Sequence, residues 1–272
     1  MKKNKSVLLS APYILWMVVF TLIPLGVVGY YALTDPDTGA FTWANILELG
    51  TYLPVFGESI LYSVVSALIC LILGYPVAYY IAHRGPVAQK FLYMLVMLPM
   101  CMSFLLRTLA WVALLQDTGI INNFLSTIGL ANVPLIRTPA AVILGMVYNY
   151  LPYMILPLYA TIVKIDHRLV EAAEDLGCNT FQVFGKVVFP LSMPGIVSGV
   201  TMVFVPAVST FYISQKLGGT DTVLIGDVIE RQFKQGSNPN LGAALSLVLM
   251  LLVFVCTGIM NRFGGDEEGV VV

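Results

Sequence analysis

Six long apolar segments do most to limit what this 272-residue chain can fold into. A helix that crosses a membrane needs about 20 mostly apolar residues, because each residue advances it by about 1.5 Å. The composition agrees, since 58% of the residues are hydrophobic and 11% are charged, whereas soluble domains contain about 25% charged residues. We therefore predict an all-α polytopic membrane protein with six transmembrane helices. They are expected at Ala11 to Leu33, Ser59 to Ala82, Phe91 to Leu115, Pro139 to Val163, Pro190 to Ile213 and Leu241 to Met260.

The connections between these segments predict how the chain is oriented, because cytoplasmic loops are enriched in Lys and Arg. One side of the predicted bundle holds the larger set, namely Lys2, Lys3, Lys5, Arg84, Lys90, Lys164, Arg168, Lys186 and Arg262. The other side holds Arg137, Lys216, Arg231 and Lys234. We therefore expect both termini in the cytoplasm. Residues 1–10 are then a cytoplasmic N-terminus, 11–263 the six-helix domain and 264–272 a mobile tail. Loops 34–58, 116–138 and 214–240 are extracellular, and loop 164–189 is cytoplasmic.

Charge and reactive residues disfavour several classes of function. A net charge of −1 offers no basic surface for a nucleic-acid backbone. The four cysteines lie far apart and the two histidines flank apolar segments, so we predict neither a metal site nor catalytic residues. An intramembrane hydrolase would need a nucleophile and a base buried together, which this pattern does not favour. A structural or signalling bundle is a further alternative.

The cytoplasmic loop between the fourth and fifth segments has the signals of two short helices. Asp166 is a candidate N-cap, and Gly177 is placed to end the first helix in a left-handed conformation. Asn179 and Gln182 then form a candidate capping box. The first helix would present a face of small and apolar residues, namely Leu169, Ala172, Ala173 and Leu176. We predict that this loop docks against a protein partner; an amphipathic connector lying on lipid headgroups is the alternative.

The same loop resembles the EAA loop of ABC importer permeases. The resemblance lies in Glu171-Ala172-Ala173, in Gly177 and in the segment Val187-Val-Phe-Pro190, which departs from the family pattern by conservative apolar changes at Val187 and Phe189. It implies the type I ABC importer permease fold and a loop that docks into a cytoplasmic ATPase. The implied coupling residues are Glu171, Ala172, Ala173, Leu176 and Gly177. ATP and Mg²⁺ would be bound by that ATPase, so no cofactor is expected on this chain.

Further segments are similar to the PotB/PotH-type permeases of spermidine/putrescine importers. They are Phe104 to Asn123, Thr138 to Tyr153, Leu217 to Gly219 and Leu224 to Gly226. This resemblance implies a polyamine permease in a bacterial inner membrane. The implied partners are a PotC-like second permease, two copies of a PotA-like ATPase and a PotD-like extracellular substrate-binding protein. A permease for another solute, such as an iron, sulfate or opine-like compound, is the alternative.

Polar and aromatic residues within the spans are candidates for the interior of the bundle. Arg107 lies in the middle of the third segment, where a charge facing lipid would cost several kcal/mol. We predict that it has a structural role, paired with a carboxylate or with backbone carbonyls, and that Trp111, one turn on, can stack on it. Aromatic faces suit a path for amines, and the candidates for path or gate are Tyr148, Asn149, Tyr153, Phe211 and Tyr212. Plain helix packing is the alternative for each of them.

Overall fold

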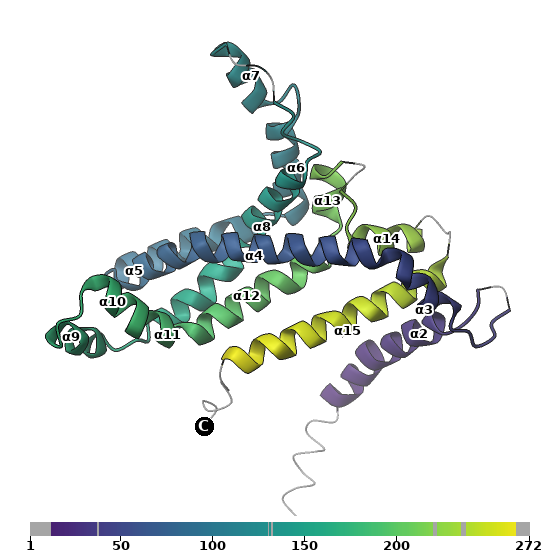
Figure 1. Cartoon of the computed structure of the whole chain (residues 1–272), viewed down its shortest axis with the longest axis horizontal. Helices are drawn as coiled ribbons and strands as arrows, with labels where there is room; N and C mark the ends of the chain where they lie inside the picture. Colours follow the sequence, from purple (N-terminus) through teal and green to yellow (C-terminus); the bar gives the residue numbers. More distant parts are fainter. Residues whose placement is uncertain are drawn as a thin grey trace, which may run out of the picture. The chain divides into compact units, whose positions relative to one another are not determined.

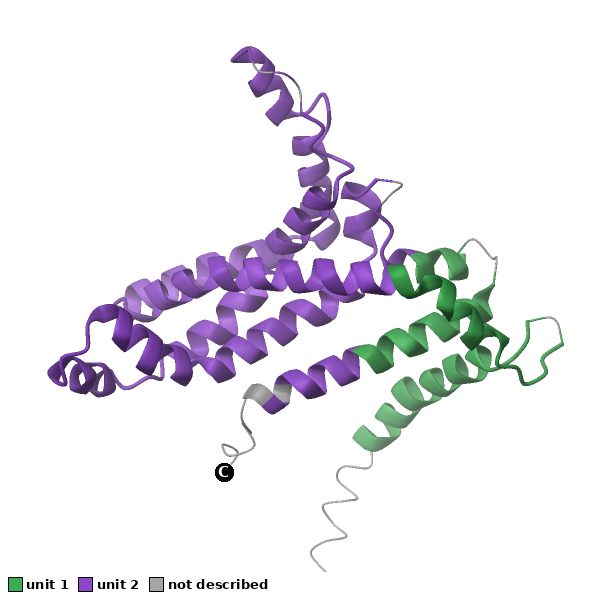
Figure 2. Ribbon diagram, in the orientation of Figure 1, with its two compact units in different colours: residues 1–54, 228–252 green, residues 55–227, 253–272 purple. Residues whose placement is uncertain are grey.

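The computed structural model describes residues 12–36, 38–129, 131, 133–219, 222–234 and 238–264. All regular secondary-structure elements within these ranges are helices (Figure 1). Thr34 and Phe41 form an isolated antiparallel bridge. The chain divides into two compact units, residues 1–54 with 228–252 and residues 55–227 with 253–272 (Figure 2). The predicted N-terminal segment 1–10 and the tail from 265 onward lie outside the described residues.

The first unit contains the first predicted span and a short loop that is pinned to it. The span runs over Pro12–Ala32 and includes a π-helical stretch, Val18–Leu22, before α2 (Ile23–Ala32). The loop carries α3 (Ala44–Glu48) and a 3-10 turn (Leu49–Tyr52). Nδ2 of Asn45 and Nδ2 of Asn240 both donate to the carbonyl of Thr34, at 2.9 and 2.6 Å. Two buried amides thus hold the end of α2.

The second unit contains most of the helices. In chain order it comprises α4 (Leu53–Ala82), α5 (Pro86–Met97), α6 (Phe104–Leu115), α7 (Ile120–Thr127), α8 (Pro139–Ile162), α9 (His167–Asp175), α10 (Thr180–Val183), α11 (Phe189–Leu191), α12 (Met193–Val208) and α13 (Tyr212–Leu217). The first residues of α4 belong to the first unit, and α14 (Ile225–Lys234) and α15 (Pro239–Gly264) each pass from one unit into the other.

Helices α8 and α12 form the main packed pair of the second unit. Gly195 and Gly199 lie on α12 where it approaches α8, and a Cβ atom at Gly199 would stand 2.7 Å from the Sδ atom of Met154. Small residues let two membrane helices come this close. The pair buries Met154, Leu158 and other apolar side chains completely, so it is the core on which the rest of the unit is built.

Two of the six predicted spans are not single straight helices. The predicted third span, Phe91 to Leu115, is wrong as one helix, because α5 gives way to a 3-10 turn at Leu98–Cys101 and Met102 is extended before α6 begins. Pro99 lies in that turn and has no N–H to continue the α-helical bonding. The predicted fifth span, Pro190 to Ile213, starts at the end of a helical arm, Thr180–Leu191, that meets Met193–Val208 at a bend of 64°, and Ile213 belongs to α13.

By length and hydropathy, five helices of the described chain can cross a membrane, and there are six if the bent pair is counted as one span. The prediction of an all-helical protein with several spans is therefore confirmed. The predicted loop 116–138 starts too early, because its residues up to Thr127 carry α7 and belong with α6 to the candidate span Phe104–Thr127. Loop 214–240 carries α14 together with part of α13.

Candidate coupling loop and transport path

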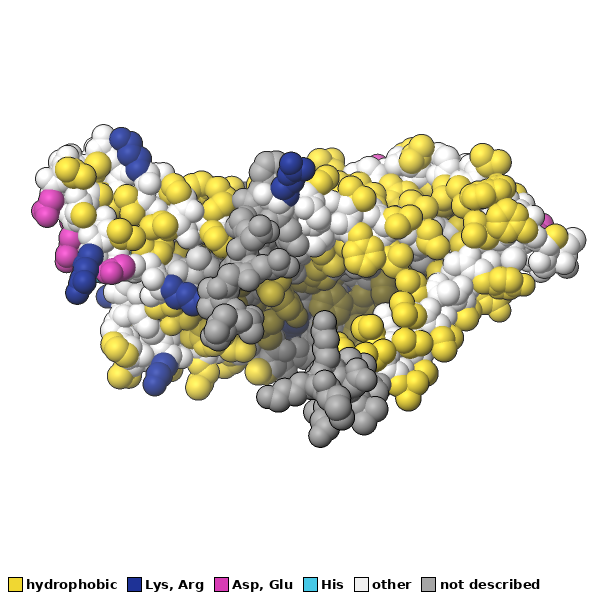
Figure 3. Space-filling view, turned by 90° about the horizontal axis from the view of Figure 1, so that it is seen from below, with side chains coloured by type: hydrophobic (Ala, Val, Ile, Leu, Met, Phe, Trp, Pro, Cys, Tyr) yellow, Lys and Arg dark blue, Asp and Glu magenta, His cyan; other side chains and the backbone are white. Residues whose placement is uncertain are grey.

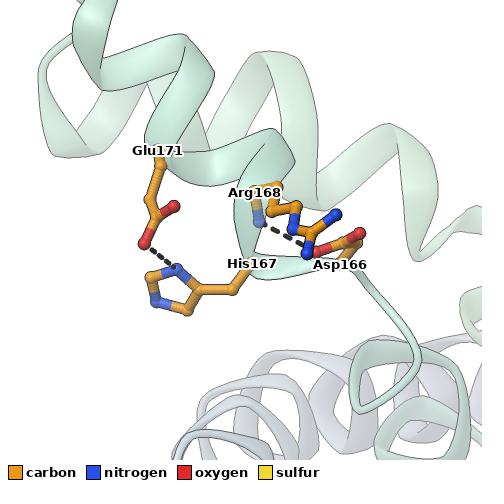
Figure 4. Close-up of polar contacts among 4 residues, drawn as sticks. All are labelled: Asp166, His167, Arg168 and Glu171. Carbon is orange, nitrogen blue, oxygen red and sulfur yellow. Dashed lines mark hydrogen bonds and ion pairs between the residues drawn. The ribbon is translucent and has the colours of Figure 1, made fainter.

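The first short helix of the loop 164–189 begins and ends where the sequence predicts. The Oδ1 atom of Asp166 accepts a hydrogen bond of 3.0 Å from the backbone N–H of Arg168, so Asp166 is the N-cap of α9 (Figure 4). At the other end Gly177 has φ of 83°, and its N–H donates to the carbonyl of Glu174 at 2.8 Å. The N–H of Cys178 donates to Ala173 at 3.1 Å, which completes a Schellman motif. Both predicted ends are confirmed.

The second short helix, α10, starts with the predicted capping box. Oδ1 of Asn179 accepts from the N–H of Gln182 at 2.9 Å, and Oε1 of Gln182 accepts from the N–H of Asn179 at 3.0 Å. A π-helical stretch, Phe184–Val188, then leads into α11. We call residues 166–183 the elbow. Its shape is fixed by bonds between residues only two to five positions apart, so it is a locally determined unit.

The elbow exposes large apolar side chains to solvent. Leu176 is 86% exposed and Phe181 is 89% exposed, and Leu169 is half exposed. Leu169, Ala172 and Leu176 share one face of α9, whereas Ala173 is partly buried and faces the protein. The predicted small-residue face is therefore divided between the two sides of the helix. Exposed apolar side chains of this size, ringed by charges, are typical of a surface that binds a partner.

The charges of the elbow stay at its surface. Nδ1 of His167 and Oε1 of Glu171 are 3.2 Å apart, and both side chains are mostly exposed (Figure 4). An exposed pair of this kind contributes little to stability. Figure 3 shows acidic and basic side chains gathered over the part of the second unit that carries the elbow. The Glu171 carboxylate is therefore accessible to a partner.

A cluster of aromatic rings joins α4 to the segment that directly follows the elbow. The ring of Phe184 meets the rings of Tyr75 and Tyr79 edge-on, with centroids 5.3 and 6.0 Å apart. Tyr75 also lies 6.2 Å from Phe189, and its hydroxyl is hydrogen-bonded to Oγ of Ser192 at 2.8 Å. The sequence reasoning missed this cluster, although Tyr75 and Tyr79 stand one turn apart on a predicted helix. The cluster therefore places the segment that follows the elbow in direct contact with α4.

Three of the predicted path residues, Tyr148, Tyr153 and Tyr212, pack against aromatic rings outside the predicted set, and no ring pair within the described chain joins two predicted path residues. The Tyr148 ring packs edge-on against Trp111 at 5.4 Å, and the Tyr212 ring lies 6.1 Å from Phe104. Tyr148, Tyr153 and Phe211 are each more than a third exposed. Asn149 differs from them, because it is 1% exposed and its Nδ2 donates to the carbonyl of Gly145 at 2.9 Å. Asn149 thus lies inside the helix packing, and a role for these residues in transport stays a prediction.

Arg107 is buried, and a stack of its guanidinium on Trp111 is not among the cation–π contacts of the described residues. The side chain is 5% exposed, and its Nε and Nη1 atoms have no hydrogen-bond partner among the described residues. Trp111 packs on Tyr148 of the facing helix, which offers it an edge-to-face contact. The predicted pairing with a carboxylate or carbonyls is not seen at those two nitrogens within the described chain.

Known proteins resemble this chain over most of its length. Residues 71–264 match the family described as "Binding-protein-dependent transport system inner membrane component". The spermidine/putrescine transport system permease protein PotB of Haemophilus influenzae is 40% identical over 253 residues, which cover 88% of each chain. The protein of the same name from Escherichia coli K12 is 37% identical over 247 residues, which cover 88% of this chain and 90% of that one. A bacterial ABC transporter involved in alginate import has a chain of the same fold, with a TM-score of 0.80 and 20% identity over 96% of both chains.

Proposed function

This chain belongs to the family of binding-protein-dependent transport system inner membrane components, and on this premise we propose that it is the permease subunit of an ATP-driven importer of spermidine and putrescine. The polyamine assignment rests on the PotB relatives described above. The observation that carries the coupling role is the elbow, which is rigidly capped, acidic and apolar at its exposed tip. Such a surface on a membrane protein fits a soluble partner that pushes on it.

We propose that the elbow docks on a cytoplasmic ATPase, with Glu171, Ala172, Ala173, Leu176 and Gly177 as its coupling residues. The exposed Leu176 and Phe181 would fill the ATPase cleft, and the Glu171 carboxylate would meet its polar rim. Closure of the ATPase on ATP would then move the elbow. The contacts of Phe184 with Tyr75 and Tyr79 would pass that movement to α4 and so rock the membrane helices.

The proposed assembly contains a PotC-like second permease, two PotA-like ATPases that bind ATP and Mg²⁺, and a PotD-like substrate-binding protein. In this assembly the elbow is cytoplasmic, and so are both termini. The positions of Lys and Arg in the loops support that orientation. The chain has no catalytic role of its own in this proposal.

We propose that the amine follows the aromatic pairs on α6, α8 and α13. Ammonium groups bind weakly over aromatic faces, with about 0.5–2 kcal/mol per contact. The exposed parts of Tyr148, Tyr153, Phe211 and Tyr212 can provide such faces. Weak contacts suit transport, because a tightly held substrate would not leave. Arg107 would repel an amine, so we assign it to the structure of the bundle and not to the path.

Uptake by the reconstituted importer tests the proposal. Labelled spermidine should enter in an ATP-dependent manner, and excess putrescine should compete with it. If excess polyamine does not reduce the uptake of labelled spermidine, the polyamine assignment is wrong and another solute is favoured. Failure of the purified chain to associate with an ATPase would instead remove the coupling role.

A further inference from the structure

A cavity of about 320 Å³ lies between the elbow and the ends of two membrane helices. Its walls come from the end of α4 and the two residues after it, the end of α8 and the residues after it, the first turn of α9 and the π-helical stretch before α11. This cavity is separate from the proposed path residues, and nothing described so far uses it. It lies where the candidate spans Ala44–Ala82 and Pro139–Ile162 end, and the ends of membrane helices are expected near lipid headgroups.

The polar part of the cavity is basic. It is lined by His83, Arg84 and His167, and no carboxylate is among its lining residues within the described chain. His83 and His167 are the only two histidines of the sequence. The rest of the lining is aliphatic and includes Val170 from α9 and Val188 from the π-helical stretch. A group that fits must therefore carry negative charge at one side and apolar surface at the other.

The three basic side chains are held in place by neighbours outside the cavity lining. The N–H at Nδ1 of His83 donates to the carbonyl of Tyr79 at 2.8 Å, and the two rings are in contact, tilted by 36° with centroids 4.1 Å apart. Nδ1 of His167 contacts Glu171 at 3.2 Å. Each histidine thus has its Nδ1 engaged, and Nε2 is the ring nitrogen left for a ligand. The guanidinium of Arg84 lies 4.1 Å over the ring of Tyr80 and supplies a permanent charge.

Two acidic groups stand near the cavity without lining it. Asp166 caps α9 through the N–H of Arg168, and Glu171 is the partner of His167. Neither belongs to the lining of the cavity.

We propose that this cavity binds the phosphate group of an anionic phospholipid, with its glycerol and upper acyl chain against the aliphatic wall. Basic pockets between membrane helices suit such headgroups. A lipid bound here would bridge α4, α8 and α9 at the root of the elbow. The elbow would then bind a membrane lipid in addition to its protein partner. This inference does not depend on which solute is carried.

The test is lipid retention by the complete transporter in nanodiscs of phosphatidylcholine doped with phosphatidylglycerol. Native mass spectrometry counts the phosphatidylglycerol that stays with the protein. Arg84→Gln should lower this retention about fivefold, the factor equivalent to about 1 kcal/mol per basic residue near a membrane. Val170→Trp should lower it as well, because it fills the cavity and leaves every charge in place. Elution on size exclusion shows that each variant is folded.

Arg168→Gln is the matched control, since Arg168 is exposed beside His167 and does not line the cavity. Equal retention by Arg84→Gln and the wild type overturns the proposal. An equal loss in Arg168→Gln also overturns it, because the attraction would then be diffuse. A further arm adds inorganic phosphate to nanodiscs of phosphatidylcholine alone. Suppose that phosphate raises the thermal stability only when Arg84 is present, and that phosphatidylglycerol is not retained selectively. The cavity would then bind free phosphate, and the proposal of a bound lipid would be wrong.

Discussion

The elbow and the α8–α12 pair, both in the second unit, are held together in opposite ways. The elbow is fixed by capping bonds between close neighbours in the sequence, and its large apolar side chains point into solvent. The α8–α12 pair is fixed by close contacts between residues about 40 positions apart, and its apolar side chains are buried. A substitution at the tip of the elbow should therefore weaken the binding of a partner. A substitution in the helix pair should lower the stability of the fold.

The largest effect is expected where the helix pair is tightest. A Cβ atom at Gly195 would stand 2.6 Å from Oγ1 of Thr161 and 3.0 Å from the carbonyl oxygen of Pro157. Gly195→Val should therefore overpack the interface by about 1–3 kcal/mol or more. We expect little monodisperse transporter after detergent extraction. Gly57→Val is the control, because nothing lies within 4 Å of a Cβ there. Equal yields from both variants would contradict the role given to this contact.

The next effect separates function from fold. Ala172→Glu places a charge on the exposed apolar face of α9 and should abolish uptake, because the elbow could no longer enter an apolar cleft. The amount of folded protein and the affinity for the substrate-binding protein should not change. Ala88→Glu adds the same charge at an exposed position of α5 and should transport normally. Normal uptake by Ala172→Glu would rule out docking through this face.

A smaller effect is expected at the end of α9. Gly177 has a positive φ, which costs a β-branched residue about 1–2 kcal/mol and costs Asn less. Gly177→Val should reduce uptake several-fold by misdirecting Leu176 and Phe181, while Gly177→Asn keeps most of the activity. Steric crowding does not contribute, since nothing lies within 4 Å of a Cβ at this position. If both variants transport equally, the left-handed turn does not set the shape of the elbow.

The smallest effect concerns the N-cap of α9. Asp166→Ala removes the acceptor for the Arg168 N–H and should weaken the helix by about 1 kcal/mol. Hydrogen exchange of the α9 amides should then accelerate about fivefold. Asp166→Asn keeps an acceptor and should exchange almost as the wild type does. Unchanged exchange in the alanine variant would show that tertiary contacts, and not the cap, hold α9.

The same contrast explains which features the sequence could predict. The caps at Asp166, Gly177 and Asn179 depend on residues within a few positions of each other, so their pattern is visible in the sequence. The spans follow from hydropathy over about 20 residues. Both kinds of signal are local, and the structure confirms the caps and an all-helical membrane chain.

What the sequence could not predict depends on partners distant in the chain. Trp111 is one turn from Arg107, yet its ring packs on Tyr148, which lies on another helix. The link from Phe184 to Tyr75 likewise joins residues more than 100 positions apart. The sequence did not predict the interruption at Met102, because hydropathy does not report whether the backbone leaves the helical conformation. The exposed fractions that single out Leu176 and Phe181 also follow only from the packed structure.

The 64° bend between Thr180–Leu191 and Met193–Val208 has a mechanical consequence. Since 64° is nearer to a right angle than to zero, a thrust along the first arm acts mostly across the second. The longer arm would therefore mainly rotate about Ser192, with little translation along its own axis. A short stroke at the short arm would become a larger sweep at the far end of the long one, where Val208 lies.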